Sequence, residues 1–285
     1  MSKKALALAL MLLVNHTHAI VIRHDTGYTR YVASESQFPA VFWLERQQSR
    51  KICVATLVHP QWALTAAHCV EETSISQGIA AEGGFEVRIA GAATVIDQVV
   101  MHPDYHYRDH PQHPEKEVDL ALLRIAAPVA VLPMPLYRSH SELDQVATLL
   151  GWGFFGIGTT GIQYDDGRFR RADNVVSAAN NRLRFIFDDP RQPGSAAVEL
   201  EGMPGLGDSG GPALLRGDDG WALAGVAVGE VSLHPEGDTQ GLYGATSVYE
   251  RVSSHLQWIE SVIAEQPSPL LSGRGLSDRE LVQPE

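Results

Sequence analysis

The chain has 285 residues, of which 44% are hydrophobic and 20% are charged. This length and apolar content allow a sizeable core, in one large all-β unit or two medium-sized ones. Acidic residues outnumber basic ones and give a formal net charge of −12. Such a charge argues against nucleic acid or an anionic membrane as a partner.

Residues 1–19 have the pattern of a secretory signal peptide. Two lysines precede an apolar run, and the small residues Thr17 and Ala19 stand just before the expected cleavage point. The apolar run is too short to span a bilayer as a helix, so a cleaved signal is favoured over the alternative, a buried N-terminal helix. The mature protein would begin at Ile20 and be secreted, either to a periplasm or beyond the cell.

Short β-like segments fill most of the chain after residue 38 and are separated by Gly, Pro, Asp and His. This spacing is typical of a barrel or sandwich rather than of alternating strands and helices. A weakly patterned connector at residues 128–142 divides the segments into two halves, so we expect an all-β fold of two barrels, at about 38–130 and 143–252. The expected strands are 40–44, 52–58, 62–65, 85–89, 93–101 and 120–125, then 145–152, 182–187, 212–215, 221–228 and 242–249.

The C-terminal region combines one helix with a tail. Ser254 and Gln257 form a capping-box pattern before apolar residues at helical spacing, which predicts a helix over about 254–265. Residues 267–285 contain three prolines and show no periodicity. We therefore expect a disordered tail there.

The only two cysteines are Cys53 and Cys69. In a secreted chain, an even pair sixteen residues apart predicts one disulfide, and a two-cysteine metal site is the weaker alternative.

Two further clusters suggest binding sites, but both are interpreted as surface features. Four histidines lie in one stretch, and three arginines form a short basic run. We interpret the histidines as decoration of a surface loop and the arginines as a solvated loop face, and we expect no metal and no cofactor. The residues are His102, His106, His110 and His113, and Arg168, Arg170 and Arg171.

Three residues carry the chemistry that the sequence suggests. Ser209 lies in residues 207–212 (GDSGGP), where glycines permit a tight loop that presents a nucleophile; an ordinary glycine-rich turn is the alternative. Because a serine needs a base, His68, beside Cys69, is the candidate, since imidazole exchanges protons near neutral pH. Asp119 is a lone acid at the start of an apolar strand, where a carboxylate requires a hydrogen-bonding partner.

Four motifs together resemble the secreted trypsin/chymotrypsin-like serine peptidases. They are residues 65–69 (TAAHC), 119–123 (DLALL), 151–153 (GWG) and 207–212 (GDSGGP), in the family's order. The resemblance covers about residues 38–263 and implies two six-stranded antiparallel β-barrels with the site between them, followed by a C-terminal helix. It also implies that Cys53 and Cys69 form the disulfide that braces the histidine loop.

The resemblance assigns roles to the candidate residues. Ser209 would be the nucleophile, His68 the general base and then acid, and Asp119 the residue that orients His68. The backbone N–H groups of Gly207 and Ser209 would form the oxyanion hole. In this family a freed Ile-Val N-terminus pairs with the aspartate before the nucleophile, which implies a possible activation pair of Ile20 and Asp208. An ordinary signal-cleavage end is the alternative.

The substrate pocket departs from the trypsin pattern. Met203, six residues before the serine, would lie at the pocket floor and favours an apolar or small substrate side chain. The predicted walls are Val228, Gly229, Glu230 and Ser247. The first three replace a Ser-Trp-Gly sequence, so the wall serine that helps to hold the triad aspartate is missing. Glu230 near the mouth would instead favour a basic substrate residue.

These observations predict a secreted serine endopeptidase that hydrolyses peptide bonds through a Ser-His-Asp triad and an acyl-enzyme intermediate. Its partners would be protein or peptide substrates and protein protease inhibitors, and we expect it to act as a monomer. A catalytically inactive binding protein on the same fold is the alternative, which the intact triad disfavours. A housekeeping protease of the HtrA type is disfavoured by the cysteine pair.

Overall fold

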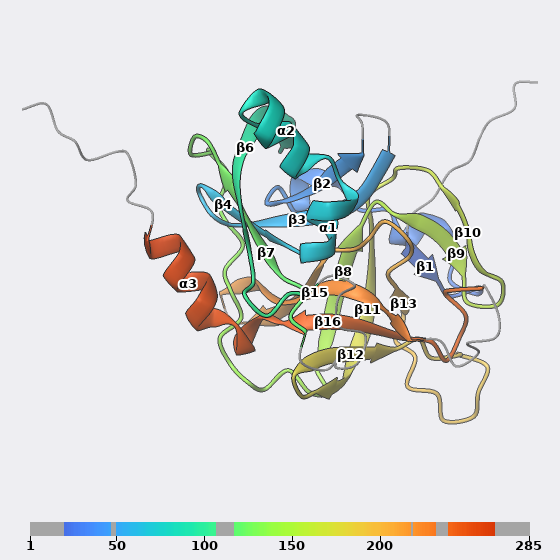
Figure 1. Cartoon of the computed structure of the whole chain (residues 1–285). Coiled ribbons are helices and arrows are strands. Elements are labelled where there is room, and N and C mark those ends of the chain that lie inside the picture. Colours follow the sequence, from blue (N-terminus) through green and yellow to red (C-terminus); the bar gives the residue numbers. More distant parts are fainter. Residues whose placement is uncertain (1–19, 47–49, 107–116, 218, 232–238, 266–285) are drawn as a thin grey trace, which may run out of the picture.

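The computed structural model describes residues 20–46, 50–106, 117–217, 219–231 and 239–265. Two six-stranded antiparallel units make up most of the molecule, and a helix follows at the C-terminal end (Figure 1). The predicted two-barrel fold with a C-terminal helix is therefore confirmed. The predicted signal peptide and C-terminal tail lie outside the described residues.

The first barrel is a six-stranded sheet in the order β2-β3-β4-β7-β6-β5, whose end strands β2 and β5 contact each other. Its buried core is rich in Leu, Val and Ala. All four residues of β4 and four of the five residues of β7 are buried. Two short helices, which the sequence did not predict, connect β4 to β5. The elements are β2 (Val41–Arg46), β3 (Arg50–His59), β4 (Trp62–Thr65), α1 (Ala67–Glu72), α2 (Ile75–Glu82), β5 (Phe85–Ile89), β6 (Ala92–Met101) and β7 (Ala121–Ile125).

The second unit is a closed barrel in the order β11-β12-β16-β15-β14-β8. Every strand expected from the sequence overlaps a strand of one of the two barrels. The sequence did not predict β11, although its side chains alternate between buried and partly exposed. The elements are β8 (Val146–Gly151), β11 (Arg170–Ala179), β12 (Arg182–Ile186), β14 (Pro212–Gly217), β15 (Gly220–Val231) and β16 (Thr246–Arg251).

A small four-stranded sheet, in the order β10-β9-β1-β13, joins the start of the described chain to the segment before Ser209. Its strands are β1 (Ile20–Ile22), β9 (Phe154–Ile157), β10 (Gly161–Asp165) and β13 (Gly202–Met203). All three residues of β1 are buried. Val21 pairs with Met203 on one side and with Gly156 on the other, so β1 is an internal strand of the sheet.

The C-terminal helix α3 (Leu256–Glu265) begins two residues later than expected, because Val252–Ser254 forms a 3-10 turn. Two further 3-10 turns, Tyr28–Tyr31 and Glu35–Gln37, connect β1 to β2. In the part of the chain that the structure describes, no helix has the length and apolar character needed to cross a membrane.

Candidate active site

Strand pairing in the first barrel brings His68 and Asp119 together. Antiparallel β4 and β7 are in register with Thr65 opposite Ala121. His68 lies three residues after the end of β4, in the first turn of α1, and Asp119 lies two residues before β7. Because the end of one antiparallel strand meets the start of its neighbour, both residues reach the same edge of the sheet.

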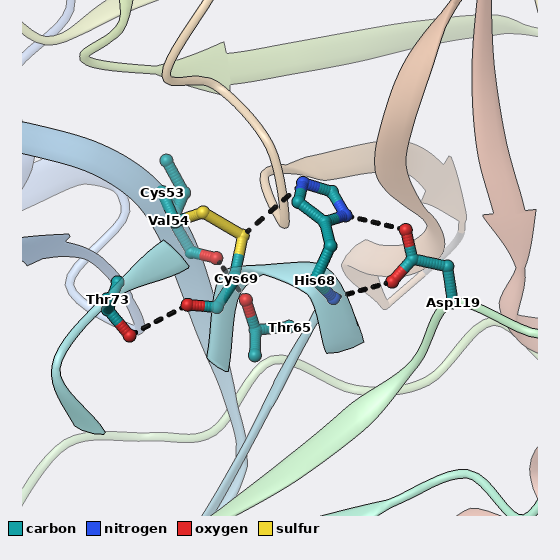
Figure 2. Close-up of a disulfide and its surroundings, with 7 residues drawn as sticks. All are labelled: Cys53, Val54, Thr65, His68, Cys69, Thr73 and Asp119. Atoms are coloured by element: carbon teal, nitrogen blue, oxygen red, sulfur yellow. Dashed lines mark hydrogen bonds and ion pairs between the residues drawn. A yellow bond between two sulfur atoms is a disulfide. The ribbon is translucent and has the colours of Figure 1, made fainter. Parts of the chain in front are cut away.

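Asp119 contacts His68 at two points (Figure 2). One carboxylate oxygen, Oδ2, is 2.6 Å from the ring Nδ1, and the other, Oδ1, accepts the backbone N–H of His68 at 2.9 Å. Burial lowers the pKa of His68, but the hydrogen bond and charge of Asp119, together with Glu72 and Glu71, outweigh burial, and the net shift is upward. The arrangement therefore stabilises the protonated imidazole.

The predicted disulfide is confirmed, with Cys53 and Cys69 bonded and their Cα atoms 5.9 Å apart. It ties α1 to β3 directly beside His68, whose Nε2 lies 3.9 Å from Cys69 Sγ (Figure 2). Thr65 Oγ1 also donates to the carbonyl of Val54 at 2.7 Å. The histidine backbone is thus held by a covalent link and by a buried hydrogen bond.

The loop that carries Ser209 packs against the same segment. The Ser209 carbonyl accepts the N–H of Val54 at 2.7 Å. Gly210 has a φ of +76°, and a Cβ there would lie 2.3 Å from Thr65 Oγ1 and 3.2 Å from the backbone N of Ala66. Only glycine allows this contact, and it brings the serine loop against the residues that lead into His68.

Backbone hydrogen bonds fix the shape of the serine loop. Asp208 donates to Gly205 at 3.1 Å, Gly210 donates to Ala227 at 2.7 Å, and Gly211 donates to Asp208 at 2.9 Å. Gly207 adopts a φ of +90°. Within the described residues, the N–H groups of Gly207 and Ser209 take no part in these hydrogen bonds.

Asp208 is a buried carboxylate behind the loop. It accepts the N–H of Gly153 at 2.6 Å and the N–H of Gly205 at 2.8 Å. Burial raises its pKa to about 7, against the opposing effects of those two N–H groups, of the charge of Arg170 and of a hydrogen bond from the backbone of Ile20. The structure therefore brings together both members of the predicted activation pair.

A hollow beside Ser209 holds two of the predicted pocket residues, Gly229 and Glu230. The Glu230 carboxylate accepts the N–H of Gly241 at 3.1 Å, and burial raises its pKa against that hydrogen bond. Residues that the sequence did not suggest supply most of the lining, and their side chains are largely apolar. They are Ile162, Pro204, Gly205, Leu206, Ala227 and Gln240.

The other three predicted pocket residues lie elsewhere. Met203 is fully buried and packs in a cluster with Val21. Ser247 is buried, and its hydroxyl donates to a backbone carbonyl. Val228 lines a separate hollow that contains His68 and Asp119. Met203 could not be placed from the sequence because its neighbour Val21 lies on a strand far away in the chain.

The histidine cluster is only partly within the described residues. His102 is buried and packs against Trp258, with ring centroids 4.7 Å apart, whereas His106 is exposed. His110 and His113 fall outside the described ranges. Among the side chains that the structure describes, one group has metal-ligand spacing, namely Cys53, His68 and Cys69, and its two sulfur atoms are joined in the disulfide.

The interpretation of the arginine run as a solvated loop face was wrong for its central residue, Arg170. Arg170 begins β11, is fully buried and forms a bidentate pair with Asp166 at 2.7 Å. Arg168 is exposed. A buried guanidinium is tolerated because a carboxylate pairs with it, and a sequence run of like charges gives no sign of that partner.

Sequence reasoning also missed two charged residues behind the histidine. Glu250 is buried on β16, and its carboxylate accepts the backbone N–H of Asp119 at 3.0 Å. Arg182 on β12 lines the hollow with His68 and Asp119. Glu250 lies within β16, whose sequence TSVYER mixes polar and apolar residues, so its local sequence gave no signal of this role.

The two barrels, the disulfide beside the histidine and the glycine-rich serine loop define a protein of the serine-peptidase class. The family model for Trypsin matches residues 29–259, and the chain belongs to the trypsin family. The resemblance seen in the motifs is thereby confirmed, and membership supports a peptidase activity.

Individual relatives are distant. Serine protease 28 of Mus musculus is 27% identical over 231 residues, which is 74% of this chain and 78% of that protein. An uncharacterized peptidase of Corynebacterium glutamicum is 27% identical over 228 residues, covering 76% and 66% of the two chains. Vitamin K-dependent protein C of Rattus norvegicus is 28% identical over 241 residues, covering 77% and 48%. The matched region thus spans from about half to about three quarters of these relatives.

Proposed function

We propose that the protein is a secreted serine endopeptidase that cleaves peptide bonds in proteins or peptides through an acyl-enzyme intermediate. The observation that carries this proposal is the two-point contact between Asp119 and His68, next to the loop that presents Ser209. The predicted N-terminal signal supports secretion.

In the proposed mechanism, Ser209 Oγ attacks the carbonyl carbon of the scissile bond, and His68 Nε2 takes the hydroxyl proton. Asp119 accepts the Nδ1 proton of His68 in a hydrogen bond, which leaves Nε2 free to act as the base. Asp119 also stabilises the imidazolium that forms. His68 then gives the proton to the leaving amine, and a water molecule releases the acyl group by the same route. Catalytic hydrogen bonds to the nucleophile often tighten only when substrate is bound.

The N–H groups of Gly207 and Ser209 would stabilise the negative charge that develops on the substrate carbonyl oxygen. The positive φ of Gly207 supports this role, because that conformation turns the peptide N–H groups of the loop in one direction. Donors of this kind typically contribute about 100- to 1000-fold in rate.

For the substrate, we propose an apolar or small side chain at the cleaved residue. The hollow beside Ser209 is lined in part by the apolar side chains of Ile162, Pro204, Leu206 and Ala227. Glu230 at the same hollow is the observation that favours the second possibility, a basic residue.

A fluorophosphonate reagent tests the proposal, because it reacts with an activated serine. We expect it to label Ser209, and we expect Ser209→Ala to abolish both labelling and cleavage of a peptide mixture. The matched control is Ser261→Ala, which removes an exposed hydroxyl on α3 and should leave labelling unchanged. A folded protein that is not labelled would instead favour the inactive binding protein.

A further inference from the structure

The carboxylate of Asp119 receives hydrogen bonds from His68, through its backbone and its ring. Two residues of the second barrel line the hollow beside this pair, Val228 and Arg182. Val228 has no polar side-chain atom, and the hydrogen bonds of Arg182 go to Glu250 and to the carbonyl of Glu117. The direction of the Asp119 carboxylate therefore depends on where the main chain of Asp119 is held.

That main chain is held by side chains of the second barrel. Glu250 Oε1 accepts the N–H of Asp119 at 3.0 Å, and Arg182 donates from its terminal nitrogen to the carbonyl of Glu117 at 2.7 Å. These two contacts fix the peptide groups on either side of Val118. Residues 117–119, which lead into β7, are thus held by hydrogen bonds at two successive peptide groups.

Arg182 and Glu250 also hold each other. They lie directly opposite on the paired strands β12 and β16, and Glu250 Oε1 is 2.9 Å from the Arg182 Nε and 2.7 Å from its terminal nitrogen. Glu250 is almost fully buried, whereas Arg182 is one quarter exposed. A buried carboxylate requires such a partner, so the pair is a rigid unit set into the wall of the second barrel.

The geometry of these contacts points to a positioning role, and this inference rests on the proposed function. We propose that Arg182 and Glu250 act as one unit that fixes the Asp119 main chain, so that its carboxylate meets His68 although Val228 offers it no hydrogen bond. Both belong to the barrel that carries Ser209, whereas Asp119 leads into the other barrel, so the pair also sets the alignment of the two halves of the site.

Two substitutions at Glu250 separate positioning from charge. Glu250→Ala removes the acceptor for the Asp119 N–H, whereas Glu250→Gln removes the same charge but keeps an acceptor oxygen. A displacement of about 1 Å in a catalytic group can cost on the order of a hundredfold. We therefore expect kcat to fall about tenfold to a hundredfold in the alanine variant, with KM within about twofold, and to recover in the glutamine variant to within about threefold of wild type.

A second buried pair in the same barrel provides the control. Glu142 pairs with Arg251, the next residue along β16 from Glu250, and is fully buried. Glu142→Ala should lower stability as Glu250→Ala does, but leave kcat per fluorophosphonate-titrated site unchanged. Where Glu250→Ala does not fold, Arg182→Gln replaces it, and its kcat should fall at least about fivefold.

Three results would overturn the positioning role. One is an unchanged kcat in folded Glu250→Ala or Arg182→Gln. Another is an equal loss in Glu250→Ala and Glu250→Gln, and the third is an equal loss in Glu142→Ala. These variants are compared only after the wild-type protein has been shown to be labelled at Ser209. If the wild type is not labelled, the proposed function itself fails, and the two failures can therefore be told apart.

Discussion

Asp119 and His68 are joined by two hydrogen bonds, one to the ring and one to the backbone of the same histidine. The carboxylate thereby fixes both the position of the histidine and the orientation of its imidazole. The register of β4 with β7 sets this contact, so it is a direct consequence of how the first barrel pairs its strands.

Replacing Asp119 by asparagine should leave the fold intact and remove most of the activity. An amide cannot stabilise the imidazolium, and it favours the wrong tautomer of His68, so kcat should fall by about 10⁴-fold, as is typical of this triad. Because Asp119 raises the pKa of His68, the acidic limb of the kcat/KM profile should also move to lower pH. The measurement is peptide hydrolysis as a function of pH.

The control for that variant is Asp97→Asn. Asp97 forms an ion pair with Arg124 in the first barrel, on β6 and β7, and partly exposed pairs of this kind contribute about 0–1 kcal/mol. A loss of activity in Asp97→Asn as large as in Asp119→Asn would contradict the role given to Asp119.

Removal of the disulfide should lower stability. The bond between Cys53 and Cys69 closes a loop of sixteen residues, and crosslinking a loop of this size typically adds about 3 kcal/mol to the free energy of unfolding. We expect the double variant Cys53→Ala/Cys69→Ala to lose about this amount in urea unfolding. Dithiothreitol should destabilise the wild type but not the double variant, and equal sensitivity of the two proteins would refute the account.

The disulfide could be predicted from the sequence, because two cysteines allow one intramolecular pairing. Ser209, His68 and Asp119 each stand in a short, distinctive segment, which was enough to propose them as candidates, and the structure places Asp119 against His68. Strand β11 could not be predicted because its interior is partly polar. Arg170 is buried with Asp166, and Asn174 is buried with hydrogen bonds to two backbone carbonyls, so the alternation of apolar and polar residues that marks a strand is lost.

The lining of the hollow beside Ser209 could not be predicted from local motifs, because distant strands build it. The pairing of β1 with β13 places Met203 against Val21, and a motif near Ser209 contains no information about that contact. Glu250 and Arg182 were missed for the same reason, since their roles depend on the pairing of β12 with β16.

Cleavage before Ile20 should activate the protein. Ile20 is buried and has a φ of 63°, a conformation that costs a β-branched residue about 1–3 kcal/mol. That torsion exists only while a residue precedes Ile20, and cleavage would also create an ammonium group beside the buried Asp208 carboxylate. We expect protein that begins at Ile20 to be labelled by a fluorophosphonate at least about tenfold faster than protein with one added alanine. The new ammonium group would lower the pKa of Asp208, and a change of one pKa unit already corresponds to about 1.4 kcal/mol, or about tenfold.

A double-mutant cycle checks that prediction. In the Asp208→Asn background, the added alanine should make no further difference, because its effect acts through the carboxylate. Equal labelling rates for the extended and unextended wild-type chains would argue against the activation pair.

Glu201 should make stability depend on pH. Burial raises its pKa to about 7, against the hydrogen bonds from the backbone of Val198 and Asp188. The folded protein therefore binds this proton more tightly than the unfolded chain, so the stabilisation is present at pH 4.5 and is lost as the pH rises through about 7. Between pH 4.5 and 8, Glu201→Gln should gain about 3 kcal/mol relative to wild type in urea unfolding. Glu82→Gln, on the exposed face of α2, should gain nothing.

The hollow beside Ser209 can be narrowed without disturbing the fold. Gly229 lines it, and a Cβ at this position would meet no atom within 4 Å. A valine there suits a strand and should fill space that the substrate side chain would occupy. Because one methylene group in such a pocket is worth about 1–3 kcal/mol, Gly229→Val should lower kcat/KM at least about tenfold for substrates with Leu or Phe at the cleaved residue, and much less for Ala.

The matched control for this variant is Gly217→Val, at the exposed end of β14 where a Cβ would also have room, and it should leave the preference unchanged. A uniform loss across all substrates in Gly229→Val would mean that the hollow does not receive the substrate side chain. If profiling of the wild type instead gives a strong preference for Arg or Lys, then the apolar lining does not set specificity. In that case Glu230→Gln should abolish the preference, since Glu230 is the one carboxylate among the residues that line this hollow.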